Sequence, residues 1–194
     1  MEEIRPFPAK NVRHEDRRLP RGPDAAIAFH NMKVKAGVVG VGAIGRNHAR
    51  VYAELESADL VAIYDANHDH ARALAAEFGT EAVATLEELV ARVDAASVAT
   101  PTVTHREVAT QLLSAKKHVL VEKPISDSVD DAKAMIDLAA EMGCVLQVGH
   151  IERFNPVMSR LEAVLDSPKF IECHRLSPFP QPRLDIGVVL DLLI

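Results

Sequence analysis

Three glycines interrupt the stretch AGVVGVGAIGRNHARVY, Ala36 to Tyr52, where an apolar run gives way to a helical pattern. They are Gly40, Gly42 and Gly45, spaced as G-x-G-x-x-G. Glycine weakens strands and helices, so it is expected here for a tight turn, a close approach of backbone to ligand, or close packing of helix against strand. The amide groups at the start of the following helix would then bind the phosphates of a dinucleotide.

An acidic residue further along the chain also indicates dinucleotide binding. Asp65 lies twenty residues after Gly45, at the end of the second apolar run. A carboxylate there would accept hydrogen bonds from the hydroxyls of the adenosine ribose. It would also repel a 2′-phosphate, and the residues that follow, ANHDH, contain no arginine to receive one. The sequence therefore favours NAD over NADP, and the alternative is an aspartate that only caps the next helix.

Short apolar runs alternate with amphipathic runs from Met32 onward, which predicts an α/β fold. We expect strands at Lys33–Val39, Leu60–Asp65, Ala95–Thr100, Val119–Glu122 and Val145–Val148, a short sixth strand near Ala82–Ala84, and helices at about Ala43–Glu56, Asp69–Phe78, Leu86–Arg92, His105–Ala115 and Val129–Met142. Thr104 with Glu107 predicts a capping box, and Thr85 predicts an N-cap. Strands joined by helical crossovers indicate a doubly wound parallel sheet, a Rossmann fold, with helices on both faces.

Composition excludes several classes of protein. The chain has 194 residues, a net charge of −6 and two cysteines. This charge gives no electrostatic basis for binding nucleic acid or an anionic membrane. No apolar run approaches the roughly 20 residues of a membrane span, and no signal peptide opens the chain. The two cysteines do not form a metal-type pair, so we expect reduced thiols and a cytoplasmic protein.

Three predicted strands end in segments that could complete a site, because ligands of such sheets bind beyond the carboxyl ends of the strands. These segments are ATPTVTH (Ala99–His105), VEKPIS (Val121–Ser126) and QVGHIERFNP (Gln147–Pro156). In the second, Lys123 would hold a cation at the sheet edge and Pro124 would fix the turn. The alternative for Lys123 is a solvated surface charge.

These segments, together with GVVGVGAIG and in this order and spacing, resemble the glucose–fructose oxidoreductase, inositol dehydrogenase and rhizopine-catabolism (Gfo/Idh/MocA) family. The EKP element is the most specific part of the resemblance, which implies that Lys123 lies beside the nicotinamide and the reacting hydroxyl as a catalytic residue. It also implies a cis peptide between Lys123 and Pro124. The cofactor-binding residues it implies, with those of the glycine motif, are Gly40, Gly42, Ala43, Ile44, Gly45, Asp65, Thr100, Pro101, Thr102, His105, Glu122 and Lys123.

Within the family, GHIERFNP and the last segment of the chain are most similar to the branch acting on nucleotide-activated amino sugars, the UDP-N-acetylglucosamine 3-dehydrogenases. This implies a sugar or nucleotide-sugar substrate that contacts His150, Arg153 and Asn155. Arg153 and Arg175 could bind a diphosphate, or could equally form surface ion pairs. The resemblance also implies a homo-oligomer for a full-length form.

The first thirty residues mix proline with both charge signs and lack periodicity, which predicts a flexible leader over residues 1–31. The resemblance implies a dinucleotide-binding domain over 32–150 and the truncated start of an α+β substrate domain over 151–194, in which we expect a helix near Pro156–Leu165 and a strand near Phe170–Leu176. It also implies that Asp191 is catalytic, because it matches an aspartate that the family pairs with a histidine four residues later, which would be position 195. Without that histidine, turnover by this chain is in doubt, and the alternative is a dinucleotide-binding protein without activity.

Two histidine groups have simpler interpretations. His68 and His70 resemble a pair of metal ligands, but the sequence offers no evident further ligand, so we expect no metal site. His48 shares a helical face with Ile44, Val51 and Leu55. That spacing predicts a packed histidine.

Overall fold

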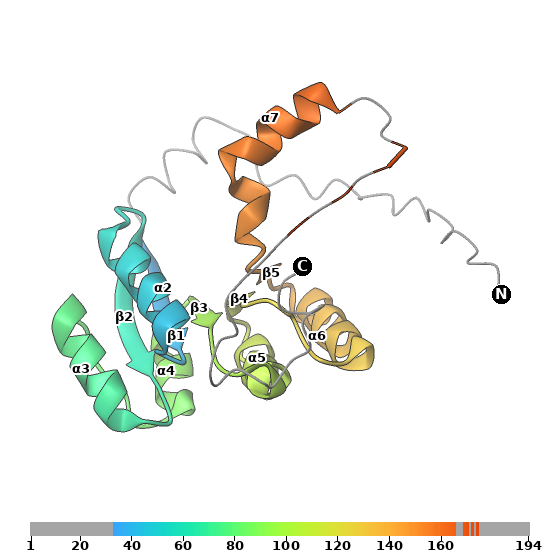
Figure 1. Ribbon diagram of the computed structural model, residues 1–194. Coiled ribbons are helices and arrows are strands. Elements are labelled where there is room, and N and C mark those ends of the chain that lie inside the picture. Colours follow the sequence, from blue (N-terminus) through green and yellow to red (C-terminus); the bar gives the residue numbers. More distant parts are fainter. Residues whose placement is uncertain (1–32, 166–168, 171, 173, 175–194) are drawn as a thin grey trace, which may run out of the picture. The chain divides into compact units, whose positions relative to one another are not determined.

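The structure is a computed structural model that describes residues 33–165, 169, 170, 172 and 174. The expected leader at 1–31, Arg175 and Asp191 lie outside these residues, as does most of the strand expected near Phe170–Leu176. Figure 1 shows the described elements along the chain.

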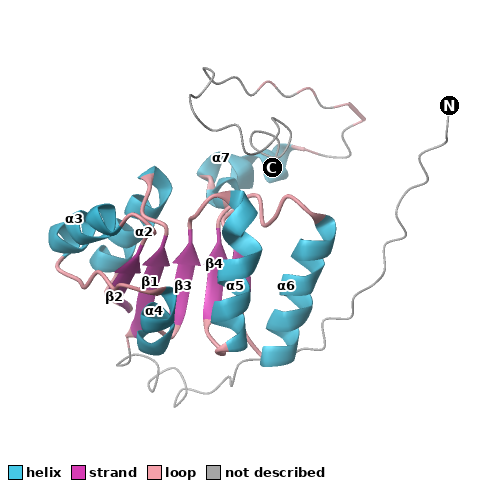
Figure 2. Cartoon of the chain, turned by 90° about the horizontal axis from the view of Figure 1, so that it is seen from below, coloured by secondary structure: helices cyan, strands magenta, loops and turns pink. Residues whose placement is uncertain are grey.

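Five parallel strands form one sheet in the order β2-β1-β3-β4-β5 (Figure 2). Their bounds are Val34–Val39 for β1, Ala58–Tyr64 for β2, Ala95–Val98 for β3, His118–Val121 for β4 and Leu146–Val148 for β5. The order reverses between β1 and β3, as in a doubly wound fold. The predicted fold class is therefore confirmed.

Helices connect the strands and cover both faces of the sheet. They are α2 at Ala43–Glu54, α3 at His68–Phe78, α4 at Leu86–Arg92, α5 at His105–Ser114, α6 at Val129–Met142 and α7 at Pro156–Val164, with short 3-10 turns η1 at Thr102–Thr104 and η2 at Ile151–Phe154. In the part of the chain that the structure describes, no helix is long and apolar enough to span a membrane.

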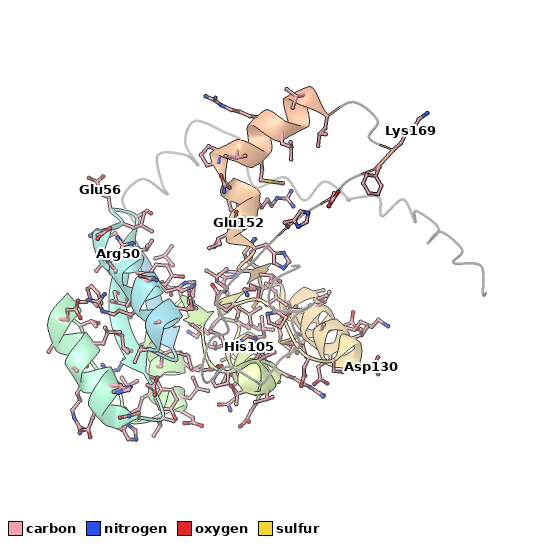
Figure 3. The ribbon with its side chains drawn as sticks, in the orientation of Figure 1. Arg50, Glu56, His105, Asp130, Glu152 and Lys169 are labelled. Atoms are coloured by element: carbon pink, nitrogen blue, oxygen red, sulfur yellow. The ribbon has the colours of Figure 1, made fainter. Side chains whose placement is uncertain are left out.

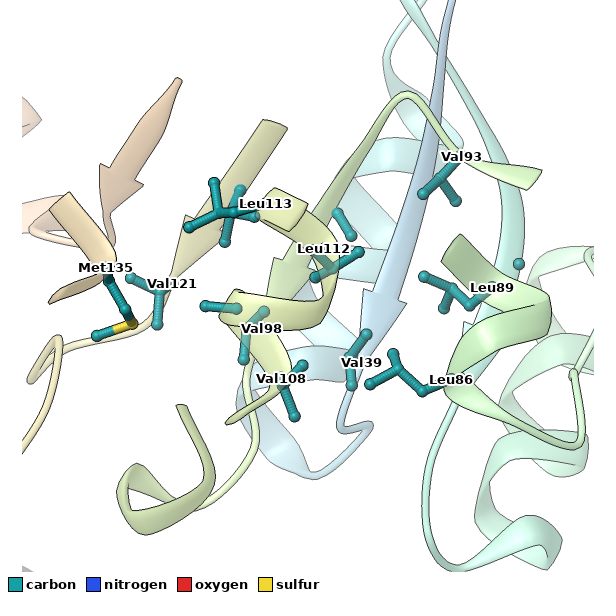
Figure 4. Packing of buried hydrophobic residues seen from close by; sticks show 14 of the residues in the cluster. Val39, Leu86, Leu89, Val93, Val98, Val108, Leu112, Leu113, Val121 and Met135 are labelled. Atoms are coloured by element: carbon teal, nitrogen blue, oxygen red, sulfur yellow. The ribbon is translucent and has the colours of Figure 1, made fainter. Parts of the chain in front are cut away.

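Successive side chains of a strand point to opposite faces of the sheet, and here they contribute to two separate cores. Val39 and Ala62 face the larger core, which is completed by side chains of α4, α5 and α6 such as Leu89 and Leu112 (Figure 4). Val38 precedes Val39 and Ile63 follows Ala62, so these two side chains point to the opposite face and lie in the smaller core under α2 and α3. The carboxyl-terminal parts of β1 and β2 are thus buried on both faces, which explains why their sequences are apolar there.

Two local predictions are wrong, and one is confirmed. The expected sixth strand is a single parallel bridge between Ala82 and Ile63. Thr104 forms no capping bond with the start of α5, because the preceding 3-10 turn leaves its backbone in a helical conformation. Its hydroxyl instead donates to Thr100 Oγ1 at 2.8 Å. Thr85, in contrast, accepts from the amide of Glu88 and caps α4 as predicted.

Candidate cofactor site

The register of the strands brings all five carboxyl ends to one edge of the sheet. Tyr64 pairs with Val39, Val39 with Val98, Val98 with Val121, and Val121 with Val148. The residue that follows each strand therefore lies on this edge. In sheet order these residues are Asp65, Gly40, Ala99, Glu122 and Gly149, and they belong to the segments that the sequence singled out.

The glycine motif forms a tight loop between β1 and α2. Gly40 has a φ of +83°, a conformation that disfavours other residues. A Cβ on Gly45 would lie 1.8 Å from the carbonyl oxygen of Gly40, so the helix can approach the loop only without a side chain there. A Cβ on Gly42 would meet nothing within 4 Å. Two of the glycines thus serve the turn and the packing, and the third faces open space.

The beginning of α2 presents unpaired backbone donors to that space. Gly42 is the N-cap and supplies no side-chain cap. Arg46 is the first residue whose amide closes the helix, donating to the carbonyl of Gly42 at 2.9 Å. The amides of Ala43, Ile44 and Gly45 precede it and have no acceptor within the helix, and the positive end of the helix dipole lies with them. This arrangement suits an anionic group.

Asp65 follows β2, and two backbone amides hold its carboxylate in place. Its Oδ2 accepts from the amide of Val41 at 2.7 Å, and its Oδ1 accepts from the amide of Asn67 at 2.8 Å. The N-cap of α3 is Asn67, whose side chain accepts from two amides of the first turn. Asp65 is therefore not the helix cap that the alternative interpretation required. Each of its oxygens retains a lone pair for a further donor.

The EKP segment follows β4, and the peptide between Lys123 and Pro124 is cis, as the family resemblance implies. His105, only 1% exposed, is the first residue of α5 (Figure 3) and contacts this turn. Its Nδ1 lies 3.0 Å from the carbonyl oxygen of Pro124, and its Nε2 lies 2.9 Å from that of Thr100. The ring thus bridges the segments after β3 and β4, because each of its nitrogens lies within hydrogen-bonding distance of a backbone carbonyl oxygen.

His48 is packed, as predicted, but its partners are polar. Its Nε2 lies 2.8 Å from Glu122 Oε1, and the side chains of both residues are largely buried. The apolar residues whose spacing suggested the packed face, Ile44, Val51 and Leu55, are exposed. Helical spacing therefore did not identify the buried face of α2 and could not reveal that Glu122 lies opposite His48.

Two more polar residues at this contact were missed by the sequence reasoning. Ser97 in β3 is fully buried and lies 3.0 Å from His48 Nδ1 and 2.7 Å from the hydroxyl of Tyr52. A signal was present in the sequence: a serine inside a short apolar strand, and a histidine and tyrosine four residues apart on one helix.

The remaining predicted site residues occupy three places. Thr100, Pro101 and Thr102 follow β3 and lead into η1, and Thr102 is buried. His150 follows β5 directly, Arg153 lies in η2, and Asn155 is the N-cap of α7. Among the described residues no group of three or more histidine, cysteine or acidic side chains could hold a metal ion.

Comparison with known proteins decides the family. The sequence profile of the Gfo/Idh/MocA oxidoreductase family, described as an NAD-binding Rossmann fold, matches residues 34–150. The chain belongs to the Gfo/Idh/MocA family. The match covers the whole sheet, the glycine loop and the EKP segment.

Individual relatives of this family member are sugar dehydrogenases. It is 40% identical over 162 residues to a UDP-N-acetylglucosamine 3-dehydrogenase of Acidithiobacillus ferrooxidans, which covers 83% of this chain and 51% of that protein. It is 36% identical over 156 residues to inositol 2-dehydrogenase 1 of Saccharopolyspora erythraea, covering 74% of this chain and 46% of that protein. The chain spans about half the length of these relatives.

Solved structures of relatives share the fold. UDP-N-acetylglucosamine 3-dehydrogenase GnnA from A. ferrooxidans superposes with a TM-score of 0.78 at 40% identity, over 83% of this chain and 53% of that one. GenD2 from gentamicin A biosynthesis, solved in complex with NAD, superposes with a TM-score of 0.66 at 34% identity, over 68% of this chain and 38% of that one.

The surroundings of Glu122 lower the pKa of its carboxyl group. Burial raises this pKa, but the hydrogen bonds from His48 and from the amide of Lys123, together with the charges of these two residues, lower it by more. The net pKa is therefore below the ordinary value. A lowered pKa in the folded state means that the ionised carboxylate stabilises the fold.

The glycine loop yields a matched pair of substitutions. Gly45→Ala should lower the free energy of unfolding by about 3 kcal/mol or more, because its methyl group would collide with the Gly40 carbonyl. Gly42→Ala should change it by no more than about 1 kcal/mol, since the space is open and only the N-cap is affected. Urea unfolding of both variants measures this, and equal losses would contradict the loop geometry.

Glu122 predicts a pH dependence of stability. Above about pH 4.3, the ordinary pKa of glutamate, the wild-type chain should be more stable than Glu122→Gln. Because the folded pKa is lowered, that advantage should disappear as the pH falls through the folded value. Unfolding midpoints of both chains between pH 7 and pH 3 test this. A difference that stays constant or grows toward acid would show that the carboxylate is not stabilised as described.

Proposed function

We propose that the chain is the cofactor-binding part of an NAD-dependent oxidoreductase. The reaction would transfer a hydride between nicotinamide and a hydroxyl-bearing carbon of a sugar, in particular a nucleotide sugar. One observation carries the proposal: the register of the strands gathers the glycine loop, Asp65 and Lys123 on a single edge of the sheet. Each of them supplies a different function that a dinucleotide oxidoreductase needs.

The phosphates are assigned to the glycine loop. The free amides at the start of α2 would donate to them, and the open space at Gly42 would let the backbone approach closely. The adenosine ribose is assigned to Asp65. Since the amides of Val41 and Asn67 already hold this carboxylate in place, a 2′-phosphate would meet a fixed negative charge. This supports NAD in preference to NADP.

The nicotinamide and substrate end is assigned to the segment around Lys123. NAD, when bound, accepts the hydride with its electron pair, and the proton of the substrate hydroxyl must go to a base. The ammonium group of Lys123 would stabilise the oxygen as negative charge develops on it. His105 supports this function by fixing the turn from behind. The family pattern assigns the proton transfer to residues near Asp191.

The substrate class is supported by the relatives. The similarity to a UDP-N-acetylglucosamine 3-dehydrogenase over 83% of the chain favours a nucleotide sugar. His150, Arg153 and Asn155 are proposed to contact it, because they follow β5 at the edge that carries the site. We further propose a leader at 1–31, a dinucleotide-binding domain at 32–150 and the start of a substrate domain at 151–194. A cytoplasmic location and a homo-oligomeric full-length form are proposed as well.

Titration with NADH tests cofactor binding. The chain has no tryptophan, so the fluorescence of the cofactor itself reports binding. We expect saturable binding of NADH, weaker binding of NADPH, and at least about a tenfold loss in Gly42→Ala, whose methyl group would stand where the phosphates approach. Lys116→Ala, at the opposite end of β4, is the control and should bind normally. Failure of the unsubstituted chain to bind either cofactor would overturn the proposal.

Turnover separates the enzyme from the second candidate, a dinucleotide-binding protein without activity. NADH formation is followed in the presence of NAD and either UDP-N-acetylglucosamine or myo-inositol. We expect the nucleotide sugar to be the substrate of an active form, and Lys123→Met to lower kcat by about 10²–10⁴. NADH binding without turnover of either compound supports the second candidate, and turnover of inositol alone contradicts the substrate class.

A further inference from the structure

A continuous chain of hydrogen bonds runs through the fold behind the candidate site. The hydroxyl of Tyr52 lies 2.7 Å from Ser97 Oγ, which lies 3.0 Å from His48 Nδ1. His48 Nε2 lies 2.8 Å from Glu122 Oε1. The other oxygen of Glu122 accepts from the amide of Lys123 at 3.1 Å. The chain thus links α2, β3 and the segment after β4.

The contact with Glu122 fixes one proton of this chain. An ionised carboxylate only accepts, so Nε2 of His48 must carry the proton that Glu122 accepts. On the other side of the ring, Nδ1 can accept from the hydroxyl of Ser97, which then accepts from Tyr52, or it can donate to Ser97, which then donates to Tyr52. Both arrangements require a donor at Nε2, and among the described residues no buried side-chain nitrogen or oxygen lacks a partner.

Glu122 is also confined on its other side. A Cβ on Gly149, the residue after β5, would lie 2.6 Å from Glu122 Oε1. The carboxylate thus occupies the space that a side chain at Gly149 would need. Glu122 therefore lies between His48 on one side and Gly149 on the other.

We propose that His48 is a positioning residue for the EKP turn. Its Nε2–H donates to one oxygen of Glu122 while the other oxygen accepts from the amide of Lys123, so that the glycine-loop helix and Lys123 keep a fixed separation. This inference rests on the proposed function, since the separation matters only if one ligand contacts both. His48 begins the link one helical turn after Gly45, on the helix that would bind the phosphates.

Sheet order explains why such a link is needed. The glycine loop follows β1 and the EKP turn follows β4, and β3 lies between these two strands. No main-chain ladder joins β1 to β4 directly. The contact from His48 to Glu122 crosses that gap by side chains alone, and Ser97 of β3 supports it from below.

The charge of Glu122 depends on the same contact. Burial raises its pKa, and the hydrogen bond from His48 is the largest influence that opposes burial. His48 from α2 and Lys123 from its own segment are the charged or titratable groups that act on this carboxylate among the described residues. Removing the imidazole while retaining burial would therefore raise the pKa of Glu122.

The first test is a spectroscopic one and needs no ligand. The chain is labelled with ¹⁵N-histidine, and the signals of His48 are assigned by their loss in His48→Gln. We expect Nε2 to carry a proton that exchanges slowly with water. Glu122→Ala should make that proton exchange rapidly. An Nε2 without a proton, or a slow Nε2 proton that Glu122→Ala leaves unchanged, would overturn the inference.

The second test uses NADH as the probe and compares two substitutions of His48. Glutamine can still donate to Glu122, whereas alanine cannot. His48→Ala should weaken NADH binding about tenfold, the effect of one lost hydrogen bond to a charged group, and His48→Gln should stay within about threefold of wild type. As the pH falls, NADH binding should also begin to weaken at a higher pH in His48→Ala than in wild type, because the pKa of Glu122 is raised in the variant. His118→Asn, at the opposite end of β4, is the control and should change neither value.

The outcomes separate this inference from the proposed function. Equal weakening by alanine and glutamine at unchanged melting temperature, or no weakening by either, would overturn the positioning role while NADH binding itself stands. If the unsubstituted chain binds no NADH, the proposed function fails together with the role that depends on it. The ¹⁵N measurement then still decides whether His48 holds Glu122. A variant that does not melt cooperatively is replaced by His48→Asn, which should weaken binding as alanine does because it is too short to reach Glu122.

Discussion

The alignment of the five strand ends is the constraint on which the candidate site depends. Because Tyr64, Val39, Val98, Val121 and Val148 pair in one row, the chain leaves the sheet at the same level five times. A shift of one residue in β1 or β2 would exchange the side chains that face the two cores, so packing against both cores favours the observed register. The same burial that stabilises the sheet therefore determines which residues reach the edge.

Side chains then join segments that the main chain leaves separate. Asp65 connects the end of β2 to the glycine loop, His105 connects the segment after β3 to the turn after β4, and His48 connects α2 to Glu122. Each link reaches from the segment after one strand to a segment next to another, and each is at least partly shielded from water. Shielding strengthens such bonds and makes an unpaired partner costly, so the segments resist moving independently.

The sequence predicted what depends on local pattern. The glycine spacing, the position of Asp65 and the alternation of apolar residues placed the loop and the five strands, because turn chemistry and side-chain period are local properties. The single bridge at Ala82, the uncapped Thr104 and the environment of His48 escaped prediction because each depends on a partner that is distant in sequence or on a preceding turn. Glu122 lies 74 residues from His48, and no helical spacing reveals such a contact.

The order of the strands also gives the edge an electrical polarity that bears on the proposed ligand. A fixed carboxylate, Asp65, follows β2, the positive end of α2 begins beside β1, and the ammonium of Lys123 belongs to the segment after β4. Three strand spacings separate β2 from β4, about 14 Å. A ligand that contacts all three groups must be extended along the edge, with hydroxyl donors at one end and its anionic part in between. An extended dinucleotide meets these conditions, because a ribose with free hydroxyls adjoins its pyrophosphate. The proposed link between His48 and Glu122 would set the spacing of the second and third groups, and it would therefore bear on binding as well as on stability.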